Sequence, residues 1–125
     1  MSTFIDLPFP PSVNRIWRMP KGGGKPYLDT RYQSWKRVAD NLYLANKRNW
    51  KPVAGNFRAT ITLDINHRGR TDLDNRVKAI LDWLQRVELI ENDSLCDGLN
   101  VKWGRATEGC RVEIRPAHSQ ARVAA

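Results

Sequence analysis

The sequence has few cysteines and no long apolar run. Only Cys96 and Cys110 occur in its 125 residues, and their spacing matches no metal-ligand pattern. We therefore expect two reduced, partly buried thiols rather than a disulfide framework. No apolar stretch approaches the roughly 20 residues needed to span a bilayer, and residues 1–6 show no signal-peptide pattern. These absences favour a cytoplasmic protein with no membrane partner.

Acidic residues are also scarce relative to basic ones. The chain has 13 Asp and Glu against 21 Lys and Arg, which gives a formal net charge of +8 and a pI near 10.0. This balance favours a polyanionic partner, most simply nucleic acid. The alternative is a soluble domain with a solvated basic face. The length fits one domain, residues 1–125, and we find neither an internal repeat nor a domain boundary.

Hydrophobic periodicity predicts an α+β fold, with a mixed sheet of four to five strands and two main helices in the order β-α-β-α-β-β. The expected strands are residues 3–7, 57–66, 95–103 and 110–115, and the first of these is a candidate for a sheet edge. The clearest has one apolar face, formed by Phe57, Ala59, Ile61, Leu63 and Ile65.

The two expected helices cover residues 30–49 and about 72–87. The buried stripe of the first contains Tyr32, Trp35, Val38, Ala39, Leu42 and Ala45. That of the second contains Val77, Ile80, Leu81 and Leu84. Residues 19–26 are expected to form a plain linker, with a basic flap over DNA as the alternative. Residues 88–94 are expected to form a polar turn, and residues 117–125 a frayed tail.

Two acidic residues lie one residue apart where the strand pattern changes to the helix pattern. Asp72 and Asp74 belong to Arg68-Gly69-Arg70-Thr71-Asp72-Leu73-Asp74-Asn75-Arg76-Val77-Lys78. Alternate residues of an extended segment point the same way, so both carboxylates can face one point. Their repulsion raises both pKa values unless a cation neutralises them, and Mg²⁺ is held by such carboxylates together with phosphate oxygens. The pair therefore indicates a divalent-metal site facing a polyanion. A helix N-cap is the structural alternative, but it explains only one acid.

Further candidates surround this pair. Asp93 is the preferred third carboxylate over Asp82, Glu91 and Asp97, because the turn after the second helix can return it to the helix start. Lys78 lies one helical turn after Asp74 and could pair with it or place charge beside a scissile phosphate, while Asp82 offers Lys78 another ion pair. His67 is expected to be a lone exposed loop histidine. The residues expected to contact phosphates are Asn14, Arg15, Arg18, Arg68, Arg70 and Arg76.

These motifs carry a resemblance to a known family. Pro10-Pro11-Ser12-Val13-Asn14-Arg15, Arg70-Thr71-Asp72-Leu73-Asp74-Asn75, Lys78 and Asn92-Asp93 resemble the RusA family of Holliday junction resolvases in order and spacing. The similarity runs from about residue 3 to residue 115. It implies a RusA-like fold and a homodimeric, Mg²⁺-dependent endonuclease, with Mn²⁺ as a substitute ion. Such an enzyme nicks four-way DNA junctions in recombination and repair.

The resemblance also implies residue roles. Asp72, Asp74 and Asp93 would be catalytic metal ligands, Lys78 a catalytic auxiliary, and Asn75 a residue that orients the site against the nucleic acid. The family often has two acids in the later turn, whereas Asn92 occupies the first of these positions here.

Resolution of a junction requires two symmetric cuts, which a C₂ dimer supplies. Interface candidates are Leu99, Val101, Trp103 and Trp83, and burial within one chain would explain each equally well. Two other functions stay open. One is a non-catalytic basic DNA-binding protein in which Asp72 and Asp74 cap a helix. The other is a metal nuclease acting on other branched or single-stranded nucleic acid. All of these functions are expected in the cytoplasm, at the nucleoid.

Overall fold

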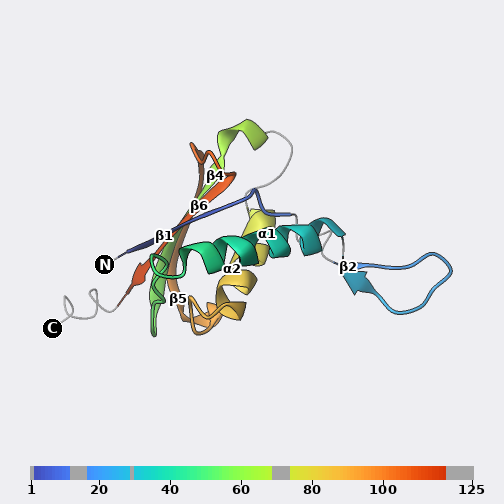
Figure 1. Cartoon of the computed structure of the whole chain (residues 1–125), viewed down its shortest axis with the longest axis horizontal. Coiled ribbons are helices and arrows are strands. Elements are labelled where there is room, and N and C mark those ends of the chain that lie inside the picture. Colours follow the sequence, from blue (N-terminus) through green and yellow to red (C-terminus); the bar gives the residue numbers. More distant parts are fainter. Residues whose placement is uncertain (1, 12–16, 29, 69–73, 118–125) are drawn as a thin grey trace.

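The chain forms one mixed four-stranded sheet with two α-helices, which confirms the predicted α+β class and element order. The computed structural model describes residues 2–11, 17–28, 30–68 and 74–117. In Figure 1 both helices lie on the same side of the sheet. Within the described residues, no helix is long and apolar enough to cross a membrane.

The sheet has the strand order β1-β6-β4-β5. The outer strand β1 (Thr3–Leu7) pairs with β6 (Cys110–Pro116), so the edge position predicted for the first strand is confirmed. Strand β4 (Phe57–Asp64) runs antiparallel to β6 and parallel to β5 (Cys96–Gly104). A parallel neighbour requires a crossover connection, and α2 (Asp74–Arg86) supplies it.

Strand β4 buries alternate residues, as the sequence predicts. Its side chains alternate between buried and half-buried along all eight positions. Ile65 is an error in the prediction, because the strand ends at Asp64 and Ile65 begins a short 3₁₀ helix, η2 (Ile65–His67). Outside the strand ladder, the Ile65 side chain is 46% exposed.

Helix α1 (Thr30–Asn46) is shorter than predicted at its C-terminal end. Residues Tyr32, Trp35 and Ala39 are buried, as expected from the apolar stripe. The assignment of Val38 and Ala45 to this stripe was wrong, since both are exposed. The backbone N–H of Trp50 donates to the carbonyl of Asn46 at 3.0 Å as the chain turns towards β4.

Helix α2 contacts α1 through a hydrogen bond that the sequence analysis did not predict. Trp83 is 1% exposed and donates its indole N–H to Asp40 Oδ1 at 2.9 Å. Arg86 forms an ion pair with the same carboxylate. Trp83 is therefore a core residue, and its suggested role at a dimer interface was wrong. Val77, Ile80 and Leu84 are buried as predicted, while Leu81 is only partly buried.

The connection after α2 is less polar than predicted. Leu89 and Ile90 are each 1% exposed, because Ile90 forms a β-bridge with Val53 and the Leu89 carbonyl accepts the Val53 N–H at 2.9 Å. Residues Asp93–Leu95 then form a 3₁₀ helix, η3, so the next strand begins at Cys96.

Two backbone contacts close the sheet. Gly109 has φ +125°, and a Cβ there would lie 2.3 Å from the backbone N of Phe9. Only glycine fits this close approach between the β5–β6 turn and the chain after β1. Ala117, predicted to be frayed, is instead 2% exposed and donates its N–H to the Asn56 carbonyl at 3.0 Å.

The expected linker at residues 19–26 is the loop of a small hairpin. Strands β2 (Trp17–Arg18) and β3 (Tyr27–Leu28) pair antiparallel in a sheet of their own. We refer to residues 17–28 as the arm. In Figure 1 the arm extends away from the rest of the molecule, beyond the start of α1.

Candidate nuclease site

The predicted metal ligands fall partly outside the described residues. Asn14, Arg15, Arg70 and Asp72 lie in undescribed segments, and for Arg18, Asp74 and Asn75 the structure describes the backbone but not the side chain. Asp74 is the first residue of α2, where the sequence predicted the change from strand to helix. The candidate site is therefore built here from Arg68, Arg76, Lys78 and Asp93, together with their contacts.

Lys78, Asp82 and Gln85 lie along one face of α2. Their separations of four and three residues place them on successive turns of the same side. Asp74 occupies the helix position four residues before Lys78, so this face begins at the predicted carboxylate pair. An acidic position at a helix start is also favoured by the helix dipole.

The short helix η3 brings Asp93 against the C-terminal end of this face, at Gln85. The Asp93 backbone N–H donates to Gln85 Oε1 at 3.0 Å. The Asn92 side chain caps η3 by accepting the Ser94 N–H at 2.9 Å. Asn92 is therefore the N-cap of η3, a role that an aspartate could also fill. The Asp93 carboxylate forms no ion pair with another described residue and is half-buried.

Lys78 pairs with a carboxylate one turn further along α2. Its ammonium forms an ion pair with Asp82 at 3.2 Å while the side chain stays 61% exposed. The hydrogen bond that Lys78 donates to Asp82 raises the pKa of Lys78, and the negative charge of Asp93 adds to the effect. Lys78 therefore keeps its positive charge. The helix-surface ion pair left open in the sequence does form.

Arg76 and His67 meet at a phenylalanine that the sequence did not identify. Arg76 donates to the Pro10 carbonyl at 2.8 Å, and its guanidinium carbon lies 5.0 Å from the centroid of the Phe9 ring. His67 stacks on Phe9, with 3.9 Å between ring centroids and 11° between the ring planes. The expectation of a lone histidine was wrong. Trp103 adds a second aromatic neighbour to Phe9 at 6.4 Å.

This cluster, which we call the Phe9 stack, spans the candidate site. His67 precedes the segment that contains Asp72, and Arg76 follows it in the first turn of α2. Phe9 thus joins the two ends of that segment. Arg68, by contrast, is an exposed residue at the end of η2, as a phosphate-contacting side chain should be. No sequence periodicity signals the stack, because its members come from four separate elements.

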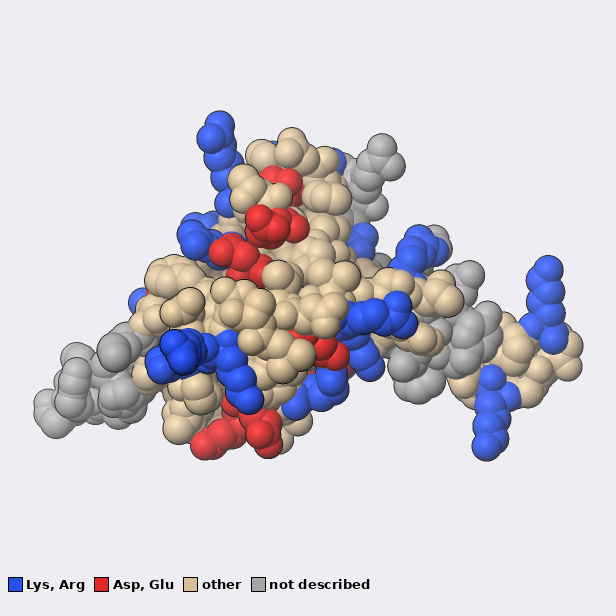
Figure 2. All heavy atoms as spheres, in the orientation of Figure 1, with Lys and Arg blue, Asp and Glu red and all other residues tan. Residues whose placement is uncertain are grey.

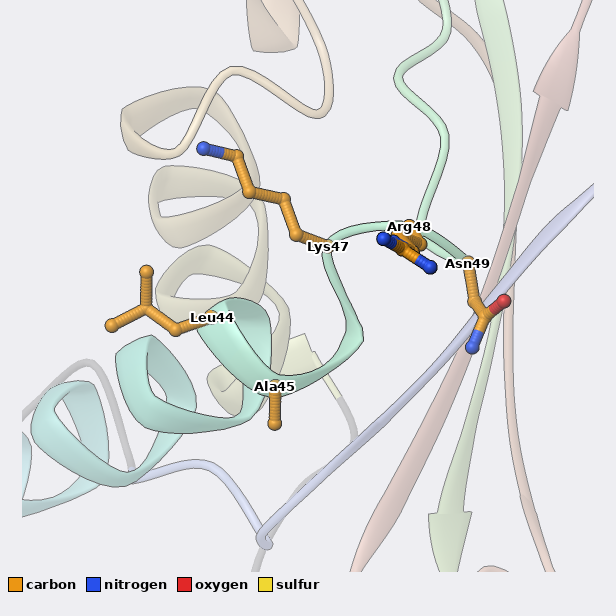
Figure 3. Close-up of a pocket in the computed structure, with 5 residues that line it drawn as sticks. All are labelled: Leu44, Ala45, Lys47, Arg48 and Asn49. Atoms are coloured by element: carbon orange, nitrogen blue, oxygen red, sulfur yellow. The ribbon is translucent and has the colours of Figure 1, made fainter.

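Among the described residues, no three acidic, histidine or cysteine side chains converge as a metal cluster. A surface pocket of about 500 Å³ lies elsewhere, at the C-terminal end of α1. Figure 3 shows its lining residues, which are Leu44, Ala45, Lys47, Arg48 and Asn49. None is a carboxylate, and Lys47 and Arg48 add positive charge, so this pocket is poorly suited to a divalent cation.

Comparison with known proteins agrees with this arrangement. Residues 8–115 match the family described as endodeoxyribonuclease RusA. A crossover junction endodeoxyribonuclease of Enterobacteria phage HK97 is 28% identical over 109 residues, covering 87% of this chain and 88% of the relative. A crossover junction endodeoxyribonuclease of Aquifex aeolicus is 31% identical over 115 residues, covering 90% and 88%. The matched region contains the Phe9 stack, all of α2, and Asp93. The chain belongs to the RusA family of endodeoxyribonucleases.

Proposed function

We propose that this protein is a Mg²⁺-dependent endodeoxyribonuclease that resolves four-way DNA junctions by paired, symmetric nicks. One observation carries the proposal: η3 packs Asp93 against α2 at Gln85, on the helix face that also carries Lys78. The family match and the +8 charge support a DNA substrate. The proposed place of action is the cytoplasm, at DNA undergoing recombination or repair.

The donor set fits a hard divalent cation. Asp93 offers a carboxylate that is not paired with another described residue, and the sequence supplies Asp72 and Asp74 beside the start of α2. These three residues would hold Mg²⁺ or, in its place, Mn²⁺. The ion would lower the pKa of bound water and offset negative charge on the phosphate being cleaved.

The protein's own residues would do the positioning. Lys78 holds a positive charge on the same helix face, suited to the scissile phosphate or the leaving oxygen. Arg68 is exposed at the edge of the site, where it would contact the DNA backbone together with Asn75 and the undescribed Asn14, Arg15 and Arg70. The Phe9 stack would fix the two ends of the segment that carries Asp72.

A homodimer is the simplest way to make both cuts, because one chain supplies one site. Strand β5 lies at an edge of the sheet and carries the remaining interface candidates. Leu99 is 46% exposed, while Val101 and Trp103 are partly buried. An edge strand can present these side chains to a partner chain, whereas Trp83 is buried in the core.

The test is a nicking assay on a four-way junction, a linear duplex and a single strand, each with Mg²⁺ and with EDTA. We expect symmetric nicks in the junction with Mg²⁺, and little cleavage of the other substrates. Equal cutting of other branched or single-stranded DNA would instead indicate a broader metal nuclease. Binding without nicking in Mg²⁺ or Mn²⁺ would refute the nuclease and leave a DNA-binding protein.

A further inference from the structure

The loop of the arm lies outside the packed core of the protein. Its ladder consists of the pairs Trp17–Leu28 and Arg18–Tyr27. Lys21 to Pro26 are exposed, and Met19 in the same loop is 65% exposed. A Cβ built on Gly22 or Gly23 would meet no atom within 4 Å. The loop is thus surrounded by open space and buries too little apolar surface to stabilise the fold.

The backbone of the loop depends on glycine. Gly22, Gly23 and Gly24 have φ angles of +81°, +93° and +112°, a region that side-chain-bearing residues rarely adopt. The Gly23 N–H donates to the Pro20 carbonyl at 3.3 Å and closes the turn. The three glycines let the chain reverse at the far end of a narrow two-stranded ribbon.

The arm is basic throughout. Its only charged residues are Arg18, Lys21 and Lys25, and no acidic residue occurs between Pro8 and Leu28. Neither lysine forms an ion pair with a described residue. In Figure 2 the basic side chains at the far end of the arm extend to opposite sides. Charges placed this way suit a partner that presents anionic groups on both sides of the ribbon.

The described residues before and after the arm lie against α2 or beside its neighbours. Before the arm, the Pro10 carbonyl accepts a hydrogen bond from Arg76 in the first turn of α2. After it, Tyr32 stacks on Trp35, which packs edge-on against Trp83 of α2. Burial is the main cause of the raised pKa of Tyr32, and the charges of Asp82, Arg86 and Lys78 also act on it. The arm therefore extends from chain segments that flank the helix carrying the proposed nuclease residues.

We propose that the arm is a second DNA-binding element, which holds a duplex arm of the junction away from the cleaved strand. The inference rests on the proposed function. B-DNA's major groove is about 12 Å wide and admits a two-stranded β-ribbon, whose lysines could then reach the phosphates on either side. An anionic partner fits the arm better than a second copy of this chain does, since the charged residues of the arm are all basic and the chain has more basic than acidic residues. The contacts are to phosphates, so they carry no sequence preference.

The test compares the wild-type protein with a Lys21→Gln/Lys25→Gln variant. Binding to a four-way junction is measured in EDTA, where cleavage is absent, at several salt concentrations. Each lost phosphate contact should reduce the slope of log K against log salt by about 0.9, so the slope should fall by about 1.8 for each arm that contacts the junction. At 0.1 M salt the affinity should fall roughly 10- to 60-fold for each such arm by the same relation.

The matched control is Lys47→Gln/Arg48→Gln at the other end of α1, which removes the same charge. We expect the slope of log K against log salt for the control to differ from that of the wild type by less than about 0.45, which is half the effect of one phosphate contact. In single-turnover cleavage with saturating enzyme and Mg²⁺, the arm variant should keep the wild-type rate within about twofold. A loss confined to the arm variant supports the proposal.

Three results would overturn the proposal. In the first, the arm variant keeps the wild-type affinity and slope. In the second, the arm and control variants lose affinity equally, as expected from net charge alone. In the third, sedimentation shows that the arm variant loses a self-association that the wild type has, which would make the arm an oligomer contact. A wild type that binds junctions but never nicks them would refute only the proposed nuclease, whereas a wild type that binds no DNA would refute both.

Discussion

Strand β4 and the arm are both extended segments, but they differ in what surrounds them. Strand β4 pairs along its length with β5 and β6, and its four inward side chains are at most 3% exposed. The arm has two paired positions on each leg and an exposed loop. Buried apolar area stabilises a fold in proportion to the surface removed from water, so β4 contributes strongly to stability and the exposed loop of the arm contributes little.

This contrast separates stability from DNA contact. In Figure 2 basic side chains occur over much of the visible face, including the far end of the arm. The two lysines in the loop of the arm are exposed. The candidate site lies between the two extremes: α2 is anchored in the core through Trp83, while Lys78 on the same helix is exposed. Changes in the three regions should therefore produce three distinct kinds of loss.

The largest effect is expected from the carboxylates. Asp74→Asn or Asp93→Asn should reduce junction cleavage by about 10³-fold or more, equivalent to about 4 kcal/mol of barrier, because a metal ligand is lost. DNA binding should be kept or tightened, since a negative charge facing phosphate is removed. Single-turnover cleavage and binding assays measure the two separately. Normal cutting by both variants would contradict the assigned site.

A core substitution should show the opposite pattern. Leu63→Ala on β4 is expected to lower the free energy of unfolding by about 2–5 kcal/mol, because it leaves a cavity at a fully buried position. The Lys21→Gln/Lys25→Gln arm variant should change that free energy by less than about 0.5 kcal/mol. Urea unfolding compares them. A large loss of stability in the arm variant would remove the distinction between the two regions.

Arg76→Met distinguishes a structural arginine from one that contacts DNA. The variant loses the charge-assisted hydrogen bond to Pro10 and the contact with Phe9. We therefore expect the free energy of unfolding to fall by about 1.5–3 kcal/mol. Phe9→Leu should share part of this loss through the same stack. Unchanged stability with a salt slope lowered by about 0.9 would instead identify Arg76 as a phosphate contact.

The smallest effect concerns Cys110 in β6. Burial raises the pKa of its thiol from 9.0 to about 12. The unfolded chain therefore loses this proton first, so the stabilisation is intact below pH 9 and is lost as pH rises towards 12. Between pH 8 and pH 10 the wild type should lose about 1.4 kcal/mol more than Cys110→Ala. Urea unfolding of both proteins across this pH range measures the difference. If the free energy of unfolding falls equally in both, the folded state does not raise the pKa of the Cys110 thiol.

The sequence predicted those parts of the fold in which local pattern and burial agree. The alternating residues of β4 and β6 and the apolar stripe of α2 depend on periodicity, which a single sequence displays. Ile65 fits the alternation but lies beyond the point where pairing stops, so periodicity alone misplaced it. Leu89 and Ile90 appeared to belong to a polar turn because their burial depends on Val53, which is distant in the sequence.

The site divides in the same way. The positions of Asp74 and Lys78 on α2 follow from helical spacing. The turn was predicted to return Asp93 to the start of this helix, whereas the Asp93 backbone is hydrogen-bonded to Gln85, near the C-terminal end. The Phe9 stack and the Trp83–Asp40 hydrogen bond join residues that are distant in the sequence, so neither residue type nor spacing could predict them. The arm was missed because a ribbon with two paired positions on each leg has no hydrophobic alternation to detect.

A crystal structure of the protein soaked with Mn²⁺, using the anomalous signal of the ion, is the most direct test of the central claim. The account predicts a peak bound by the carboxylates of Asp72, Asp74 and Asp93, with Lys78 on the same side of α2. An ion bound elsewhere, or an Asp93 carboxylate too far from the other two to share a ligand with them, would contradict it.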